Sequence, residues 1–308
     1  MHRQAELGVS TLPSGHSAWH NGWSQDSDRP FHSARMTLPI RNARIRLPQG
    51  QLFWKEVGTG PTIIFLHGAW SDSGEWTPLL DRLGDRFHCI APDLLGFGES
   101  ERLGNYSIAL ETECLADYLD TLRISQVYLV GHSIGAWVAA NYALQYAHQV
   151  SGLVLIDPEG VELDNHRYPW RRARGWVGSF PIWTLLLWLL RPLAWLLGKQ
   201  AQWRSHHRTY QKLKRSPAAC RLLFQRRWAE LQAELLTERL PWLKQPLLVV
   251  QSPTASAAQQ EMAQRYATAP QAYLQPTPAE ISALADAICA MIAGETGERP
   301  DQPRDDLG

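Results

Sequence analysis

The sequence predicts an α/β fold with a doubly wound, mostly parallel sheet and an inserted helical cap. Short apolar runs typical of strands alternate with longer segments of helical periodicity, which is the pattern of βαβ units. A glycine-flanked serine, Gly131–Gly135, lies between one such strand and the helix after it. The alternation stops for about ninety residues, 158–245, and then resumes. At 308 residues the chain is long enough for one large core with an insertion.

The first half of the chain contains most of the predicted elements. Residues 40–47 and 51–57 alternate like two antiparallel strands, with a turn at 48–50. Predicted strands follow at 62–66, 87–91, 127–130 and 152–156. Predicted helices cover 73–84, 107–122 with Ser107 as the N-cap, and the segment from the serine turn to about residue 146. After the insertion, the expected order is strand 246–250, helix 257–267, strand 272–275 and helix 279–292.

These elements divide the chain into four parts. Residues 1–37 are polar and lack periodicity, so we expect them to be disordered. The core is formed by 38–157 and 246–293, the cap by 158–245, and the tail by 294–308.

The residues that flank the serine turn have a steric explanation. A serine at the tip of a sharp strand-to-helix turn occupies strained backbone, so its neighbours two positions away on each side must be small. Gly131 and Gly135 satisfy this need. The turn lifts the Ser133 hydroxyl clear of the sheet and aims the Ile134 N–H, at a helix N-terminus, toward the same space.

Three motifs in this order resemble those of the α/β-hydrolase fold superfamily, and specifically its esterase, lipase and haloperoxidase-like branch. They are Leu66-His67-Gly68, the segment from Ala91-Pro92-Asp93 through Gly96, Gly98 and Ser100, and Gly131-His132-Ser133-Ile134-Gly135. The resemblance covers residues 38–160 well and 246–292 in outline. It implies an α/β-hydrolase core, Ser133 as nucleophile, and the backbone N–H groups of Ala69 and Ile134 as the oxyanion hole. It also implies structural roles for His67, His132 and Asp93.

The sequence departs from the family pattern where the acid and the base are expected. The segment after the 246–250 strand reads Gln251-Ser252-Pro-Thr-Ala-Ser256, without a carboxylate. The loop after the 272–275 strand has no histidine, and the last histidine of the chain is His207. A serine hydroxyl without a base is a weak nucleophile at neutral pH.

Two kinds of substitute remain open. Asp157 ends the strand after the serine helix and could be the acid, although the favoured interpretation is a residue at the strand end that caps the next turn. A cap histidine, His166, His206 or His207, could be the base if the cap brings it within hydrogen-bond reach of Ser133. A solvated pair on a basic helix is the alternative for His206 and His207.

The insertion has an unusual composition. The almost wholly apolar run 177–197 is interrupted by Arg191-Pro192, which favours two short helices over one transmembrane helix. Residues 165–245 contain sixteen Lys or Arg and three Glu, a net charge of about +13 in a chain whose formal net charge is zero. Tryptophans among leucines with basic neighbours are typical of helices at a membrane surface, and four of them are candidates for that contact: Trp176, Trp183, Trp188 and Trp195. An ordinary cap, with its apolar face lining the pocket and its basic face in water, fits the composition equally well.

The composition of the chain limits the classes of partner and cofactor that the protein is expected to bind. The balanced total charge and the absence of a groove-reading motif argue against a nucleic-acid partner. The four cysteines show neither paired nor metal-binding spacing, so we expect no metal, no cofactor and a cytoplasmic protein, peripheral at a membrane if the cap binds one. The expected ligand is an apolar acyl chain or a lipid, and the expected membrane surface is anionic.

Two functions follow from these observations. The first is a serine hydrolase of an ester or lipid that uses an unorthodox acid and base. The alternative is a catalytically inactive hydrolase-fold protein that binds a lipid or a membrane partner, which the missing histidine favours.

Overall fold

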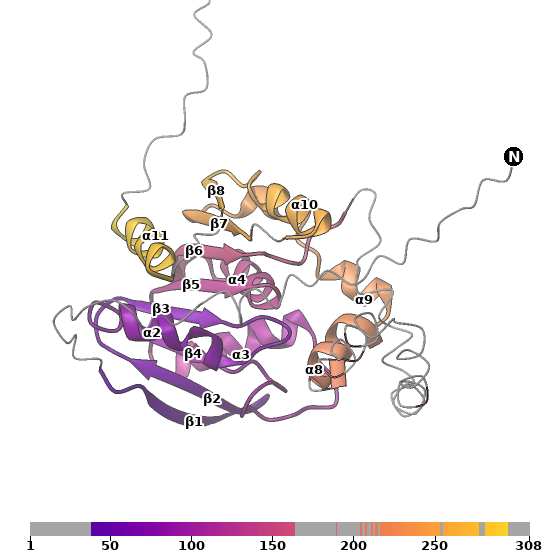
Figure 1. The fold of residues 1–308 in the computed structure, drawn as a ribbon, viewed down its shortest axis with the longest axis horizontal. Coiled ribbons are helices and arrows are strands. Elements are labelled where there is room, and N and C mark those ends of the chain that lie inside the picture. Colours follow the sequence, from indigo (N-terminus) through magenta and orange to yellow (C-terminus); the bar gives the residue numbers. More distant parts are fainter. Residues whose placement is uncertain are drawn as a thin grey trace, which may run out of the picture.

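The computed structural model describes residues 38–163, 216–252, 255–276 and 281–294, with positions 189, 204, 207, 211, 213 and 214. At its centre is an eight-stranded sheet in the order β1-β2-β4-β3-β5-β6-β7-β8 (Figure 1). The β1–β2 and β2–β4 pairs are antiparallel. All other neighbours are parallel. The predicted doubly wound, mostly parallel sheet is therefore confirmed.

The strands lie close to their predicted positions. They are β1 (Arg41–Leu47), β2 (Gly50–Val57), β3 (Thr62–Leu66), β4 (His88–Pro92), β5 (Val127–His132), β6 (Val150–Ile156), β7 (Leu247–Gln251) and β8 (Ala272–Pro276). Bounds differ from the predictions by up to two residues, because hydrogen bonding to a neighbouring strand, and not local sequence, decides where a strand ends. β6, for example, begins at Val150, which pairs with Val127.

The core helices also follow the predicted order. They are α2 (Thr77–Leu83), α3 (Ile108–Thr121), α4 (Ile134–Gln145), α10 (Ala257–Tyr266) and α11 (Ile281–Ala293). The single helix predicted for 73–84 is divided into a short 3₁₀ helix, η2 (Ser73–Trp76), and α2. Pro78 in the first turn of α2 explains the division, because proline fits a helix start but not its interior.

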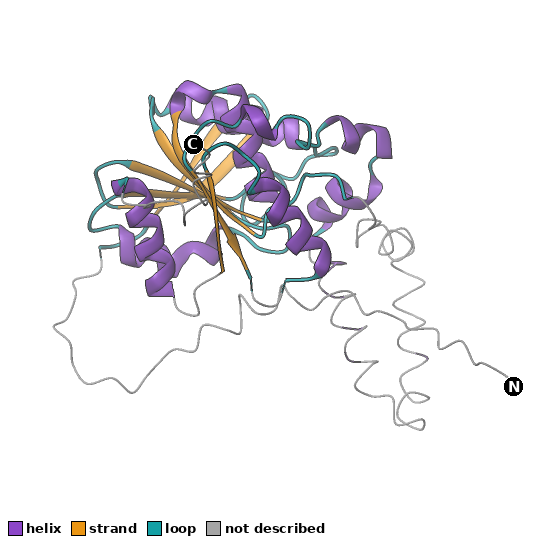
Figure 2. Cartoon of the chain, turned by 90° about the horizontal axis from the view of Figure 1, so that it is seen from above, coloured by secondary structure: helices purple, strands orange, loops and turns teal. Residues whose placement is uncertain are grey.

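Helices cover both faces of the sheet, as Figure 2 shows from above. Successive β3 side chains alternate between two apolar clusters: Ile64 and Leu66 pack with residues of α3, α4 and α10. Ile63 and Phe65 pack with residues of α2 and α11. This alternation follows from the two-residue period of a strand, and it builds one core layer on each face.

The parallel strands bring their carboxyl ends to one edge of the sheet. β3 ends at Leu66, β5 at His132, β6 at Ile156 and β7 at Gln251. Ligands of open α/β sheets bind outside these ends. The loops that follow the four strands therefore form the candidate site.

Between β6 and β7 the described residues form short helices. They are α8 (Pro217–Cys220), the π-helical η5 (Arg221–Gln225), α9 (Trp228–Ala233) and the 3₁₀ helix η6 (Leu240–Trp242). The candidate membrane tryptophans, Trp176, Trp183, Trp188 and Trp195, lie outside the described residues. Contact of the 158–245 segment with an anionic membrane surface thus stays a prediction. Within the described part of the chain, no helix is both long and apolar enough to cross a membrane.

Candidate active site

Ser133 occupies strained backbone between β5 and α4. Its φ of 52° and ψ of −114° lie outside the regions that residues with a side chain normally adopt. The two flanking glycines are required by close packing. A Cβ on Gly131 would lie 2.6 Å from the Ala136 backbone, and one on Gly135 would lie 2.2 Å from the Leu66 carbonyl oxygen. The sharp turn predicted from the sequence is thus present, with its serine at the tip.

The partner of the Ser133 hydroxyl is Glu159, a residue that the sequence analysis did not select. Ser133 Oγ donates a hydrogen bond of 2.7 Å to Glu159 Oε1. Ser133 is 1% exposed and Glu159 8% exposed. Glu159 Oε2 has no hydrogen-bond partner among the described residues. A buried carboxylate therefore lies in direct contact with the candidate nucleophile.

Burial raises the pKa of Glu159 above its ordinary value. The hydrogen bond from Ser133 and the charge of His132 oppose this shift, and the negative charge of Asp157 adds to it. A carboxylate of raised pKa is a stronger base once it is deprotonated.

The backbone around Glu159 is held from several directions. The Glu159 N–H donates to the Ser133 carbonyl oxygen at 3.4 Å. The Tyr266 hydroxyl of α10 donates to the Glu159 carbonyl oxygen at 2.7 Å. Gly160, with φ of 96°, lies against the ring of Trp137, where a Cβ would come within 2.4 Å. The segment after β6 consequently bends over the serine turn in a fixed position.

Asp157, the sequence-based candidate for the acid, lies at the junction of β6 and β7. Its Oδ1 accepts a hydrogen bond of 2.8 Å from the Ser252 N–H. Its own N–H donates to the Val250 carbonyl oxygen at 2.9 Å. These bonds link two strand ends, and the carboxylate that accepts the Ser133 hydrogen bond is Glu159. A role for Asp157 as the acid stays a prediction.

His67 and Asp93 hold the loops around the site, as the resemblance implied. His67 Nε2 accepts from the Leu94 N–H at 3.0 Å, and its ring packs edge-on against Phe97. Asp93 accepts from the N–H of Ser73 at 2.6 Å and from that of Glu99 at 2.7 Å. Both side chains thereby connect the loop after β4 to the loop after β3.

The two predicted oxyanion donors lie on neighbouring backbone. Leu66 pairs with Gly131 across β3 and β5, so the loop that carries Ala69 begins beside the serine turn. Ala69 is 1% exposed and Ile134 is fully buried. As the first residue of α4, Ile134 has an N–H without an intrahelical acceptor. Their joint action as an oxyanion hole stays a prediction.

Of the cap histidines, His166 and His206 lie outside the described residues. His207 is described and half-buried. A base from the cap therefore stays a prediction. The ends of β7 and β8, up to Ser252 and Pro276, hold neither a histidine nor a carboxylate.

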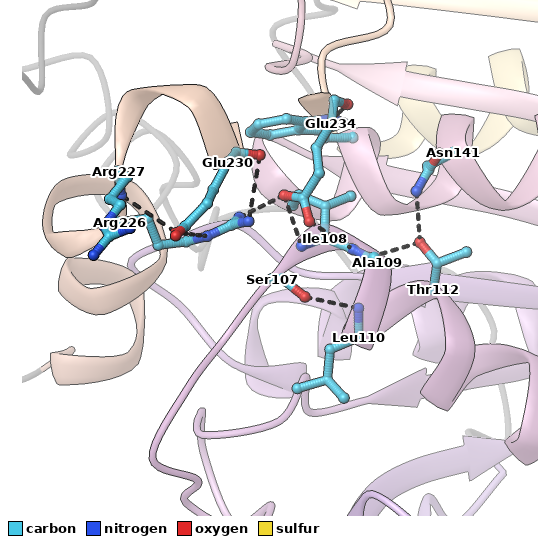
Figure 3. A network of polar contacts seen from close by, with 11 residues as sticks. Ser107, Ile108, Ala109, Leu110, Thr112, Asn141, Arg226, Arg227, Glu230 and Glu234 are labelled. Carbon is cyan, nitrogen blue, oxygen red and sulfur yellow. Dashed lines mark hydrogen bonds and ion pairs between the residues drawn. The ribbon is translucent and has the colours of Figure 1, made fainter. Parts of the chain in front are cut away.

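Residues of η5 and of the segment after it attach the insertion to the core, and Figure 3 shows the polar contacts around Glu234. The Glu234 carboxylate accepts from the N–H groups of Ile108 and Ala109, at the start of α3, and pairs with Arg226. Phe224 packs on the ring of Trp70, the residue after Ala69, at 6.1 Å between centroids. Aromatic side chains from the core and the insertion thus meet next to the predicted oxyanion loop.

Glu159 could have been found from the sequence by one signal. Asp157-Pro158-Glu159-Gly160 directly follows the strand next to the serine strand, so two carboxylates share the same strand end. Which of the two contacts Ser133 appears only in the structure, because the positive φ of 43° at Asp157 and of 96° at Gly160 sets the path of the chain.

Comparison with known proteins extends these observations. The family model of the alpha/beta hydrolase family matches residues 63–296. An uncharacterized protein of Mycobacterium tuberculosis is 36% identical over 143 residues, 46% of this chain and 42% of that protein. Haloalkane dehalogenase 2 of the same species is 33% identical over 109 residues, 35% of this chain and 38% of that enzyme. The chain therefore matches less than half the length of these curated relatives.

Solved structures show the same fold at lower identity. A membrane phospholipase A superposes with a TM-score of 0.62 at 20% identity, covering 84% of this chain and 87% of that one. A serine hydrolase from Cycloclasticus zankles superposes with a TM-score of 0.63 at 18% identity, covering 84% of this chain and all of that one. The sheet order, the serine turn and the family match over residues 63–296 lead to one conclusion: the chain belongs to the alpha/beta hydrolase family.

Proposed function

We propose that this protein is a serine hydrolase of esters with an apolar acyl chain, in which Ser133 is the nucleophile and Glu159 is the base. The observation that supports this proposal is the 2.7 Å hydrogen bond from Ser133 Oγ to the buried Glu159 carboxylate. Direct contact between nucleophile and base is the geometric requirement for general-base catalysis.

In the first half of the reaction, Glu159 takes the proton of Ser133 while Oγ forms a bond to the ester carbonyl carbon. The carbonyl oxygen becomes an oxyanion, which the Ala69 and Ile134 N–H groups would stabilise. Collapse of this intermediate breaks the bond to the alcohol oxygen, and the alcohol leaves with the proton from Glu159. An acyl group then remains on Ser133.

In the second half, Glu159 takes a proton from water as the water oxygen attacks the acyl carbon. Collapse of the second intermediate breaks the bond to Ser133 Oγ, which recovers its proton from Glu159. The carboxylic acid is released and the carboxylate is ready for another cycle. Because one carboxylate gives and takes each proton, the cycle needs no histidine.

An apolar acyl chain is the substrate class that the surroundings support. Trp70 and Phe224 pack together beside Ala69. On the segment that leads from the site into the insertion, Val161 and Leu163 are buried in the main core cluster, while Glu162 between them is exposed. Apolar side chains next to the reacting group favour an apolar substrate.

The test uses the full-length protein, a fluorophosphonate probe and nitrophenyl acyl esters of increasing chain length. We expect the probe to modify Ser133, and longer esters to be hydrolysed faster than the acetate. Glu159→Gln keeps the size of the side chain but removes the base, so turnover should fall about 10²–10⁴-fold. Glu162→Gln, an exposed glutamate on the same segment, is the matched control and should retain full turnover.

Asp157→Asn separates the two carboxylates at this strand end. Asparagine Oδ1 can still accept the hydrogen bond from Ser252, so the fold should persist and turnover should change far less than in Glu159→Gln. A larger loss of turnover in Asp157→Asn than in Glu159→Gln would show that Glu159 is not the base. Absence of Ser133 modification in the native protein would rule out the hydrolase.

A second candidate is a non-catalytic protein of the same fold that binds a lipid or another apolar ligand. It is favoured by the lack of any histidine after His207. Burial of Ser133, which is 1% exposed, also favours it. Binding of a fluorescent fatty-acid ester without turnover, unchanged in Ser133→Ala, would support this candidate over the hydrolase.

A further inference from the structure

We propose that Glu75 and His132 form a buried charged pair that positions the oxyanion loop and places a positive charge beside the Ser133–Glu159 contact. This inference deepens the proposed function and rests on it for its catalytic meaning. Both residues act through others, so they are positioning residues.

The geometry of the pair connects two elements of the site. His132 is the last residue of β5, directly before Ser133, and Glu75 belongs to η2. Glu75 Oε1 lies 2.5 Å from His132 Nδ1, and both side chains are only 6% exposed. Glu75 Oε2 accepts a hydrogen bond of 3.1 Å from the Gly68 N–H. One carboxylate thus joins the serine strand to the residue before Ala69.

Gly68 packs directly on the histidine ring. A Cβ at Gly68 would lie 2.7 Å from His132 Nδ1, a distance that no side chain could occupy without moving the ring. The position of the loop that carries Ala69 therefore depends on where the imidazole lies. Orientation of the Ala69 N–H follows from the pair through Gly68.

The pair is charged because its members stabilise each other. Burial alone would raise the pKa of Glu75, but the charge and hydrogen bond of His132, together with the Gly68 N–H, lower it to about 2. Burial alone would lower the pKa of His132, but Glu75 raises it, with smaller contributions from Asp157 and Glu159. A buried charge persists when a paired charge and hydrogen bonds compensate its lost hydration.

His132 directly precedes Ser133, whose Oγ donates to Glu159 at 2.7 Å, so the positive charge of the imidazole acts on the proposed base. The charged groups that face this imidazole are Glu75 from η2 and Asp157 and Glu159 from the segment after β6. His67, after β3, is the other ionisable group near Glu75. Burial raises the pKa of Glu159, and His132 opposes that shift. Without the imidazolium, fewer molecules would carry a deprotonated Glu159 at neutral pH.

The experiment replaces both charges at once. Glu75→Gln/His132→Asn leaves two amides that can hydrogen-bond to each other, so no unpaired charge remains buried. The protein is labelled with ¹³C at the glutamate carboxyl carbons, and Glu159→Gln identifies the Glu159 signal. We expect the carboxyl titration of Glu159 to move upward by about one pH unit or more, the size of effect that a nearby charge exerts.

A matched control uses the other described histidine–glutamate pair of the core. His88 and Glu56 lie 3.9 Å apart and are about one-third exposed (31% and 28%). Glu56→Gln/His88→Asn should leave the Glu159 titration unchanged. In the active protein, the pH midpoint of Ser133 modification should shift with the Glu159 signal in the Glu75→Gln/His132→Asn variant only.

The proposed hydrolase activity and the effect of the Glu75–His132 pair on Glu159 can be refuted independently. If Ser133 is not modified at any pH, the hydrolase is wrong, while the carboxyl titration still decides whether the pair sets the protonation of Glu159. If the folded double variant shows the wild-type Glu159 midpoint, this inference is overturned, whatever the turnover. If the double variant does not fold, the single variant Glu75→Gln is used, and the titration of ¹⁵N-labelled His132 is followed. The titration midpoint of His132 should then be lower than in the wild type. An unchanged midpoint would refute the charged pair.

Discussion

At the residue scale, the backbone of Ser133 is the most specific feature of the site. With φ of 52° and ψ of −114°, it is held in a region that costs on the order of 1–3 kcal/mol for a residue with a Cβ. Glycine adopts positive φ without this cost. The strain is tolerated because the glycine-lined turn and the Glu159 contact leave the hydroxyl one fixed position.

Two variants that both lack the hydroxyl measure this strain. Ser133→Gly should unfold at higher urea concentration than Ser133→Ala, with a free energy of unfolding larger by about 1 kcal/mol. Both variants remove the Glu159 hydrogen bond equally, so the difference reports the strain that the Cβ causes, less the conformational entropy that glycine adds to the unfolded chain. Equal stability, or a more stable alanine variant, would mean that the turn is not strained.

Glu111, on α3, is a buried carboxyl group outside the site and is 2% exposed. Burial raises its pKa to about 8, opposed by the Leu95 N–H, which donates to Oε2 at 3.1 Å. The pKa of Glu111 in the folded state exceeds the ordinary carboxyl value of 4.5, so the folded state binds the proton more tightly than the unfolded chain does. The contribution of Glu111 to the free energy of unfolding is fully present below the pKa that this residue has in the unfolded chain. It is lost as the pH rises through about 8, the pKa in the folded state.

Glu111→Gln should remove this dependence, since glutamine can still accept from Leu95 and does not ionise. Between pH 5 and 8 the free energy of unfolding of the variant should rise relative to that of the wild type. The rise should be up to about 1.4 kcal/mol per pH unit, the value for one proton. Urea unfolding at several pH values measures the gain. Glu113→Gln, exposed on the same helix, is the control, and a parallel pH profile for wild type and Glu111→Gln would contradict the assignment.

The site was only partly predictable at this scale. Ser133 and its glycines were found because their spacing reflects a local turn. Glu159 was missed because its contact spans 26 residues and depends on the path of the chain after β6. The residue that was chosen, Asp157, lies two positions earlier and hydrogen-bonds to Ser252 across the neighbouring strand end.

At the element scale, Glu234 links the insertion to α3. Its carboxylate accepts from two of the first N–H groups of that helix, at 3.3 Å each, while Ser107 caps the Leu110 N–H. A negative charge at a helix N-terminus is stabilising, and Arg226 balances the charge on the other side. Figure 3 shows both sets of contacts.

Glu234→Gln should lower the free energy of unfolding by about 1–2 kcal/mol, because it weakens charge-assisted hydrogen bonds in a mostly buried position. Urea unfolding followed by circular dichroism gives the value. Glu238→Gln changes an exposed glutamate four residues away and should have no measurable effect. If both variants unfold alike, the contact does not hold the insertion in place.

The elements were predicted correctly where a local periodic pattern defines them. The prediction failed where tertiary contacts divide a segment into separate helices. The strands of the core were identified within two residues. The 73–84 helix was predicted as one element, and its 3₁₀ start appears only with the Asp72 cap, which accepts from the Gly74 N–H. The helices of the insertion lay beyond a simple pattern, because η5 is a π-helical segment packed on Trp70 through Phe224.

At the scale of the whole molecule, the order of strands explains why distant residues form one site. Ala69, Ser133 and Glu159 follow β3, β5 and β6, which are neighbours in the sheet. Their separation in sequence disappears because parallel strands end at one edge. The sequence pattern predicted this sheet and its family, whereas the contact of Ser133 with the Glu159 carboxylate could be seen only in three dimensions.

The central claim is that Glu159 takes the proton of Ser133, and the most direct measurement is the rate of Ser133 modification by a fluorophosphonate across pH. In the wild type, the rate should rise with pH through a midpoint above the ordinary carboxyl pKa, because burial raises the pKa of Glu159. In Glu159→Gln, the rate should be about 10²–10⁴-fold lower and lack this midpoint. Modification of Glu159→Gln at the wild-type rate, with the same midpoint, would contradict the account.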